Sequence, residues 1–291
     1  MANYYCLMAG LPDITLDSPM SVNFPEIREE MEMTLNDDDK GIIFYFFLES
    51  DCKNLVRLLK DPGAAIDPNC NYTMEQYRDM ITSAREMNFN VHRYPSFMSI
   101  FARNYNYNKD VKGWYAEDTM QLEFLKYAAG CPNKMVREWY ELNLNINNVL
   151  TAMIARKEGW NISDYIQGDN EVTEMIRNNN TKDFNLSLEY DYVKELMQIV
   201  ECDDPVMKEK KIDAFKWTWL DDKTFFDVFS IEAVFAYLCK MQMLYRWQQL
   251  DPERGKETFK QIIENLRSEA KVPEEFRMKS PYYKEEGAYA K

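Results

Sequence analysis

The sequence predicts an all-α fold, and three observations carry that prediction. Only nine of the 291 residues are glycine, so the chain has little material for hairpins or glycine-rich phosphate loops. Apolar residues recur at spacings of three and four along the chain, as they do on the buried face of a helix. Several glycines follow these periodic segments, where helix C-caps are expected: Gly63, Gly130, Gly159, Gly168 and Gly255.

Composition and charge restrict the class of protein further. Apolar residues make up 46 % of the chain and charged residues 29 %, which is typical of a folded protein. A chain of 291 residues can bury a core as one large helical body or as two to three lobes. The net charge of −14 argues against nucleic acid or an anionic membrane surface as a partner. It favours solubility, or a basic protein partner.

The first expected helix follows a short apolar opening. The spacing of residues 3–13 does not distinguish a strand from a helix. A helix should follow Asn23, because Pro25 suits a first helical turn. Ile27 and Leu35 then fall on one face of that helix.

The next two helices have clear start signals. The run Asp37–Asp39 favours a helix N-terminus, since carboxylates there oppose the positive end of the helix dipole. That helix should run from about Gly41 to Lys60 and stop at the proline and glycine that follow. Thr73 and Gln76 match a capping box, which predicts a helix to about residue 87.

The remaining helices are predicted from apolar periodicity and the breaks between periodic segments. Pro95 should start the first of them, which ends near residue 107. The connectors around Gly168 and Asn178–Asn180 should be loops. The further helices are expected over residues 115–129, 133–158, 186–200, 206–219, 224–250 and 253–270.

Two segments about 94 residues apart share a pattern, which indicates an internal repeat. The earlier segment contains Asp51-x-x-Asn54 and the later one Asn145-x-x-Asn148, each on a predicted helix. An asparagine on an otherwise apolar face must find hydrogen-bond partners, so Asn54 and Asn148 should fix how their helices pack. We therefore expect helical lobes with pseudo-repeats, up to three in number, and a mobile tail over residues 271–291.

Candidate catalytic residues are few. His92 is the only histidine, and it lies in a connector without a metal-ligand or triad pattern, so a structural or exposed role is expected. Some all-α enzymes of the isoprenoid type hold magnesium on Asp-Asp-x-x-Asp motifs, and three aspartate runs therefore need an explanation. None completes that spacing, and all three are expected at helix N-termini as caps: Asp37–Asp39, Asp203–Asp204 and Asp221–Asp222. We expect no metal and no cofactor.

The cysteines and the apolar runs bear on location. Six cysteines are scattered without metal-ligand spacing, which predicts reduced and mostly buried thiols in the cytoplasm. The N-terminus has no basic n-region, so no signal peptide is expected. The longest purely apolar run, Ile42–Leu48, is far shorter than a bilayer span, so no direct membrane insertion is expected.

The repeated pattern resembles the signature of a V-type ATPase family, the C subunit of V-type and archaeal-type rotary ATPases, which is also called the d subunit. That family carries an Asp-x-x-Asn element followed by Arg and Lys at a helix end. The matching residues are Asp51-x-x-Asn54, Asn145-x-x-Asn148 and Arg156-Lys157-x-Gly159, with Asn145 standing where the family usually has Asp.

Both ends of the chain add to the resemblance. Phe235–Leu238, with Arg246 and the segment 253–266 after it, is similar to the final helical pair of the C subunit, although Trp247 stands where an Asn is expected. The opening, Tyr4–Pro12, resembles a bacterial family of unknown function that is associated with V-type ATPase gene clusters.

The resemblance implies three related helical lobes around a hollow, which we expect over residues 1–110, 111–200 and 201–270. In the family these lobes act as a socket between the central axle and the membrane rotor ring. It implies no catalysis, two protein partners, and a cytoplasmic place at the inner membrane through the complex alone. The residues it marks for structure or interaction are Asp51, Asn54, Asn145, Asn148, Arg156 and Arg246. A helical scaffold with an unrelated partner is the first alternative, and a magnesium-dependent enzyme built on the aspartate runs is the second.

Overall fold

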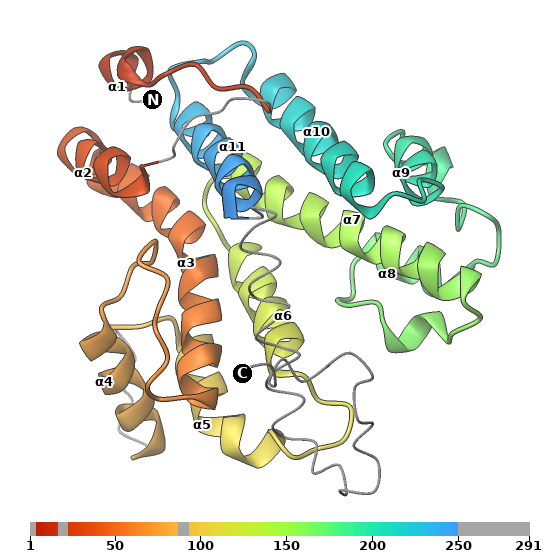
Figure 1. The fold of residues 1–291 in the computed structure, drawn as a ribbon, viewed down its shortest axis with the longest axis horizontal. Helices are drawn as coiled ribbons and strands as arrows, with labels where there is room; N and C mark the ends of the chain where they lie inside the picture. Colours follow the sequence, from red (N-terminus) through yellow and green to blue (C-terminus); the bar gives the residue numbers. More distant parts are fainter. Residues whose placement is uncertain (1–3, 17–22, 87–92, 250–291) are drawn as a thin grey trace, which may run out of the picture. The chain divides into compact units, whose positions relative to one another are not determined.

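The structure confirms the all-α prediction. It is a computed structural model that describes residues 4–16, 23–86 and 93–249 (Figure 1). Within those ranges the chain forms eleven α-helices, two short 3-10 helices and no strand, and 70 % of it is helical. His92, the helix expected over 253–270 and the tail over 271–291 lie outside the described residues.

The short opening segment is helical, and α3 and α7, which carry the repeated pattern, are the longest helices described, at 24 residues each. The elements in chain order are α1 (Tyr5–Gly10), α2 (Phe24–Thr34), α3 (Asp37–Lys60), α4 (Met74–Arg85), α5 (Ser96–Asn108), α6 (Ala116–Ala128), α7 (Lys134–Lys157), η1 (Ile162–Asp164), α8 (Glu171–Asn178), η2 (Leu186–Leu188), α9 (Val193–Val200), α10 (Pro205–Thr224) and α11 (Ile231–Gln249).

Several helices begin where the capping residues predict. Thr73 and Gln76 form the expected capping box at α4, in which each side chain bonds the backbone N–H of the other residue. The Asp204 carboxylate accepts the N–H of Val206, 2.9 Å away, and caps α10. Capping therefore accounts for one of the three aspartate runs.

Helix α3 begins four residues earlier than predicted, because the cap is Asn36. Its side-chain oxygen accepts the N–H of Asp39 at 2.9 Å, so the helix starts at Asp37 instead of Gly41. The three aspartates then fill the first turn, where they oppose the positive end of the helix dipole.

The prediction that Asp221 and Asp222 lie at a helix N-terminus is wrong. Helix α10 does not stop near residue 219 but continues to Thr224, so both aspartates lie in its last turns. The Thr224 hydroxyl donates to the carbonyl of Leu220 at 2.8 Å, within the helix end. Asp221 instead forms an ion pair with Lys240 of α11, which ties the two helices together.

The helix predicted over residues 186–200 is broken in two. A short 3-10 turn, η2, is followed by a gap before α9 starts at Val193. The rings of Tyr190 and Tyr192 pack with centroids 5.6 Å apart, which residues two positions apart on a helix cannot do. Helix α8, in contrast, was missed, although Asn170 supplies its cap by accepting the Thr173 N–H at 3.0 Å.

The packing centres on the two long helices. Helix α3 contacts α5 and α6, and α7 contacts α6, α8 and α9, while α4 and α5 pack against each other (Figure 1). A buried apolar cluster joins α7 to α9 through residues such as Val149, Phe184 and Leu196. The chain divides into two compact units, Met1–Leu244 and Tyr245–Lys291. The three lobes and the hollow between them stay a prediction.

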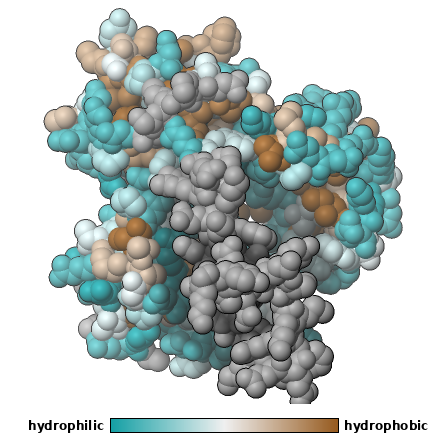
Figure 2. Space-filling model, viewed as in Figure 1, coloured by the Kyte–Doolittle hydropathy of each residue, from teal (hydrophilic) through white to brown (hydrophobic). Residues whose placement is uncertain are grey.

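The cysteines and the surface complete this description. All six cysteines are free thiols, and burial raises the pKa of four of them: Cys52, Cys70, Cys131 and Cys239. Among the described residues, no helix has the length and apolar character needed to cross a membrane. Figure 2 shows a mostly hydrophilic surface on which hydrophobic side chains gather near α1 and the α10–α11 connection.

Candidate binding groove and its anchored wall

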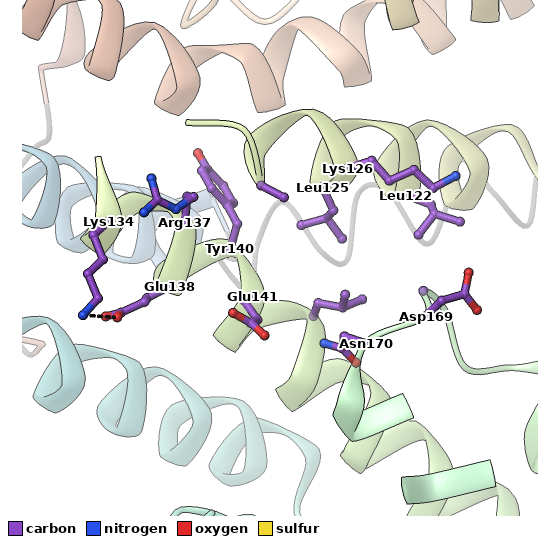
Figure 3. A pocket seen from close by; sticks show the side chains of 13 residues that line it. Leu122, Leu125, Lys126, Lys134, Arg137, Glu138, Tyr140, Glu141, Asp169 and Asn170 are labelled. Atoms are coloured by element: carbon purple, nitrogen blue, oxygen red, sulfur yellow. Dashed lines mark ion pairs between the residues drawn. The ribbon is translucent and has the colours of Figure 1, made fainter. Parts of the chain in front are cut away.

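A groove of about 630 Å³ lies between α6, α7 and the segment that leads into α8 (Figure 3). Its volume falls within the range of roughly 300–1,000 Å³ that is usual for ligand pockets. Leu122 and Leu125 of α6 and Leu144 of α7 contribute half-buried apolar side chains to its lining. Two helices thus leave part of their apolar faces uncovered toward one cavity.

Charged side chains of both signs surround this apolar lining. Lys134 lies 3.6 Å from the Glu138 carboxylate, and Lys223 of α10 donates to the same carboxylate at 2.6 Å. Burial raises the pKa of Glu138, but these two ammonium groups hold it below its ordinary value. Glu141 is exposed at the groove, so an acidic group is available to a partner there.

The segment before α8 forms one wall of the groove, and Gly168 is required in it. Its φ is +84°, a left-handed conformation that side chains with a Cβ rarely adopt. A Cβ at this position would also lie 3.2 Å from Cδ2 of Leu144, which lines the groove. Both the backbone conformation and the space therefore call for glycine.

We expect Gly168→Ala to lower the free energy of unfolding by about 1–2 kcal/mol through backbone strain and crowding. Gly159→Ala is the matched control, because Gly159 has φ +71° and open space around its Cβ position, so it reports strain alone. Gly41→Ala, within α3, should instead stabilise by up to about 1 kcal/mol. Urea denaturation of the three variants measures their free energies of unfolding. Equal losses for Gly168→Ala and Gly159→Ala would rule out an effect of the contact with Leu144.

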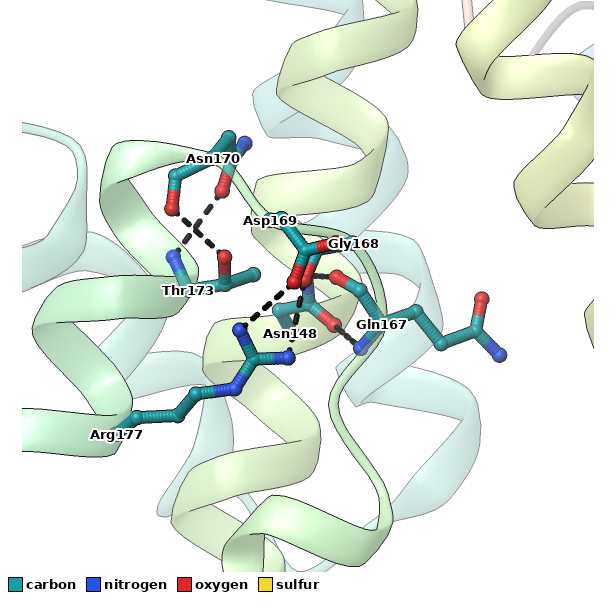
Figure 4. A network of polar contacts seen from close by, with 7 residues as sticks. All are labelled: Asn148, Gln167, Gly168, Asp169, Asn170, Thr173 and Arg177. Carbon is teal, nitrogen blue, oxygen red and sulfur yellow. Dashed lines mark hydrogen bonds and ion pairs between the residues drawn. The ribbon is translucent and has the colours of Figure 1, made fainter.

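Asn148 of α7 holds this wall in place (Figure 4). Its side-chain oxygen accepts the N–H of Gln167 at 2.9 Å, and its amide donates to the carbonyl of the same residue at 2.7 Å. Arg177 of α8 adds a bond to the Gly168 carbonyl at 3.0 Å and an ion pair with Asp169 at 3.1 Å. The groove wall is therefore fixed by side chains from the helices on either side of it.

Asn54 of α3 makes the same pair of bonds to the segment that follows its own helix. Its side-chain oxygen accepts the N–H of Asp67 at 2.8 Å, and its amide donates to the Asp67 carbonyl at 3.0 Å. Asn54 and Asn148 are both buried. In each case one asparagine side chain bonds both the N–H and the carbonyl of a single residue, as the backbone of a neighbouring strand does in a sheet.

The residues three positions earlier also correspond. Asn145 accepts the side-chain amide of Asn170, the cap of α8, at 2.7 Å. Asp51 accepts the side-chain amide of Asn71 at 2.7 Å, two residues before the cap of α4. Both patterns thus connect a long helix to the start of the following short helix. The two patterns make corresponding contacts, whereas pseudo-repeated lobes stay a prediction.

The four buried residues of the repeated pattern therefore serve the fold. Asp51, Asn54, Asn145 and Asn148 are all buried, so they are not themselves a contact surface for a partner. They position the segments after α3 and α7, and the second of those segments lines the groove. Any effect of these four residues on partner binding would act through the wall they position.

Arg156 has a similar anchoring role at the end of α7. It donates to the carbonyls of Thr181 and Lys182 at 2.7 and 3.1 Å, and its guanidinium lies 3.9 Å from the centre of the Phe184 ring. Burial lowers the pKa of this guanidinium. Arg246, which belongs to the second unit, stacks over the neighbouring Trp247 ring.

The groove itself was not anticipated from the sequence. Leu122 and Leu125 lie three positions apart on a predicted helix, a spacing that also fits a covered core face. Only the structure shows that they remain partly uncovered, because they line the groove beside α7. Among residues 4–16, 23–86 and 93–249, no group of three or more Cys, His, Asp or Glu side chains is arranged to hold a metal ion.

Comparison with known families identifies the chain. A family model described as "Protein of unknown function (DUF2764)" matches residues 1–270. The chain belongs to the DUF2764 family. That match spans all of the helices described here, so the groove and both asparagine anchors of this DUF2764 protein lie within the family region. Neither a curated protein nor a solved structure gives a significant match to this DUF2764 chain.

Proposed function

We propose that this DUF2764 protein is a non-catalytic coupling subunit of a V-type rotary ATPase, which joins the central axle to the membrane rotor ring. The observation that carries the proposal is the pair of matching anchors on α3 and α7. The pattern that resembles the C subunit of these ATPases is the same pattern that makes these anchors. If this pattern holds the segment after a long helix in both proteins, that shared role in the fold is a physical reason for the resemblance.

The groove is the surface we propose for the axle. An axle that ends in a coiled coil offers an apolar seam flanked by charged side chains. The half-buried leucines of α6 and α7 suit the seam, and Lys134, Glu138 and Glu141 suit the flanking charges. Charge pairs of this kind set register and association rate more than they set affinity.

The test is co-purification with the axle subunit of the same organism's V-type ATPase. We expect a complex that survives size-exclusion chromatography at low salt and weakens toward molar salt, because the chain carries a net charge of −14 and salt screens exposed charges. Leu125→Glu should weaken the complex about tenfold or more, since it places a charge on the apolar lining.

Two further variants make the result specific. Glu141→Lys changes an exposed groove residue, so the fold should tolerate it, and it should slow association with a basic axle. Leu188→Glu changes an exposed leucine that does not line the groove, so it should leave binding unchanged. If no complex forms with either the axle or the rotor ring at any salt concentration, the coupling role is wrong. A helical scaffold with an unrelated partner would then replace it.

A further inference from the structure

The connection between α10 and α11 carries exposed apolar side chains, and α1 contacts this connection at Phe229. The side chains of Phe225 and Phe226 are 70 % and 95 % exposed, and those of Tyr5 and Val228 are 60 % and 48 % exposed. We call these four residues the aromatic knob. Single exposed apolar residues are ordinary, but a group of them at one place marks an interaction site.

The backbone beneath the aromatic knob is held by hydrogen bonds. The Ser230 hydroxyl donates to the Asp227 carbonyl at 2.8 Å, and the Asp227 N–H donates to the Thr224 carbonyl at 3.2 Å. The Tyr4 N–H donates to the Phe229 carbonyl at 2.8 Å, which joins α1 to the connection. The knob is thus presented on an ordered turn, and a partner need not order that turn on binding.

Two separate ring pairs involve residues of the knob. The rings of Phe225 and Phe226 are 5.0 Å apart and nearly perpendicular, and the Tyr5 ring lies 4.8 Å from that of Phe229. Phe225 and Phe226 nevertheless keep most of their surface exposed. Large rigid side chains of this kind are frequent energetic centres of protein interfaces.

We propose that the aromatic knob docks into an apolar recess of the rotor ring, with basic side chains around that recess. This inference rests on the proposed function. Exposed Asp222 and Asp227 flank the two phenylalanines, so basic groups on the partner are the complement. The same carboxylates, and a net charge of −14, disfavour insertion of the knob among anionic lipid headgroups.

Shape assigns the two partners to different surfaces. The groove is concave and suits the end of a helical rod, whereas the aromatic knob is a projecting turn that suits a concave partner. Subunits arranged in a ring around an open axis leave a recess of this kind between them. A coupling protein must hold the axle and the ring at the same time, which requires two separate contact surfaces.

The experiment measures binding of the full chain to the detergent-solubilised rotor ring and, separately, to the axle subunit of the same organism. The double variant Phe225→Ser/Phe226→Ser should weaken ring binding roughly 30-fold or more, as expected for the loss of aromatic interface anchors. Axle binding should not change. Leu188→Ser, which removes an equally exposed apolar side chain elsewhere, is the matched control and should affect neither partner.

Each other outcome has a separate meaning. If the double variant binds the ring as wild type does, the knob inference is overturned and the coupling role stands. If wild type binds the axle but not the ring, the inference is overturned while the axle contact stands. If wild type binds neither partner, both the proposed function and the knob inference are wrong. Binding to phosphatidylcholine vesicles without the ring, lost in the double variant, would make the knob a lipid contact and overturn the proposal.

Discussion

Asn148→Leu is expected to lower the free energy of unfolding by about 3 kcal/mol while leaving the helix content intact. Asn148 is buried and satisfies both the N–H and the carbonyl of Gln167. Leucine has a similar volume but no polar group, so both backbone groups of Gln167 would lose their partner. Each buried group left unsatisfied costs about 1–3 kcal/mol. Urea denaturation followed by circular dichroism measures the loss.

Asn147→Leu is the matched control, because Asn147 is the adjacent asparagine on α7 and is exposed. It should change the free energy of unfolding by no more than about 0.5 kcal/mol. Amide hydrogen exchange gives a second measurement, since the Gln167 N–H bonds to Asn148 and should exchange faster in the Asn148 variant alone. If Asn148→Leu is as stable as wild type, the groove wall does not depend on this anchor.

Much of the helical framework could be predicted from local signals. Thr73 with Gln76 and the prolines near helix starts act within a few residues, so the sequence shows them directly. Two asparagine caps, Asn36 and Asn170, were missed. Asn36 lies one residue before an aspartate run, and the predicted start of the helix was based on those aspartates. Capping signals of similar strength next to each other leave more than one possible start within about one turn.

Features that depend on contacts distant in the sequence could not be predicted. Asp221 pairs with Lys240 across two helices, and Tyr190 packs on Tyr192 only because the chain turns there. The groove forms where α6, α7 and the segment before α8 come together, which no spacing within one helix encodes. The anchors are an intermediate case. The pattern identified Asn54 and Asn148 as buried polar residues, while their backbone partners became visible only in three dimensions.

Asp51→Asn is expected to have the largest effect on stability. It should lower the free energy of unfolding by about 4 kcal/mol at neutral pH. The Asp51 carboxylate is fully buried and accepts hydrogen bonds from the backbone N–H groups of Asn71 and Tyr72 at 3.0 and 3.2 Å. It also accepts the Asn71 side-chain amide at 2.7 Å and the Tyr77 hydroxyl at 2.5 Å. An amide has a single oxygen, so its NH₂ group would face donors in either orientation. Hydrogen bonds to a charged group contribute about 1.5–3 kcal/mol each, and leaving their donors unpaired adds to the loss.

The pH dependence of this variant tests the protonation of Asp51. Burial raises the pKa of its carboxyl above the reference value of 3.8, against the opposing effect of the hydrogen bonds. A raised pKa means that the folded state holds the proton to a higher pH than the unfolded state does, so wild type loses stability as pH rises through that interval. Asparagine does not titrate, so the difference in free energy of unfolding between wild type and Asp51→Asn should narrow as the pH rises above the reference pKa of 3.8. Asp118→Asn, on the exposed first turn of α6, is the control, and its free energy of unfolding should differ little from that of wild type. If the difference in free energy of unfolding between wild type and Asp51→Asn instead widens as pH rises, the hydrogen bonds affect the pKa of Asp51 more than burial does. The folded state would then favour the ionised carboxylate.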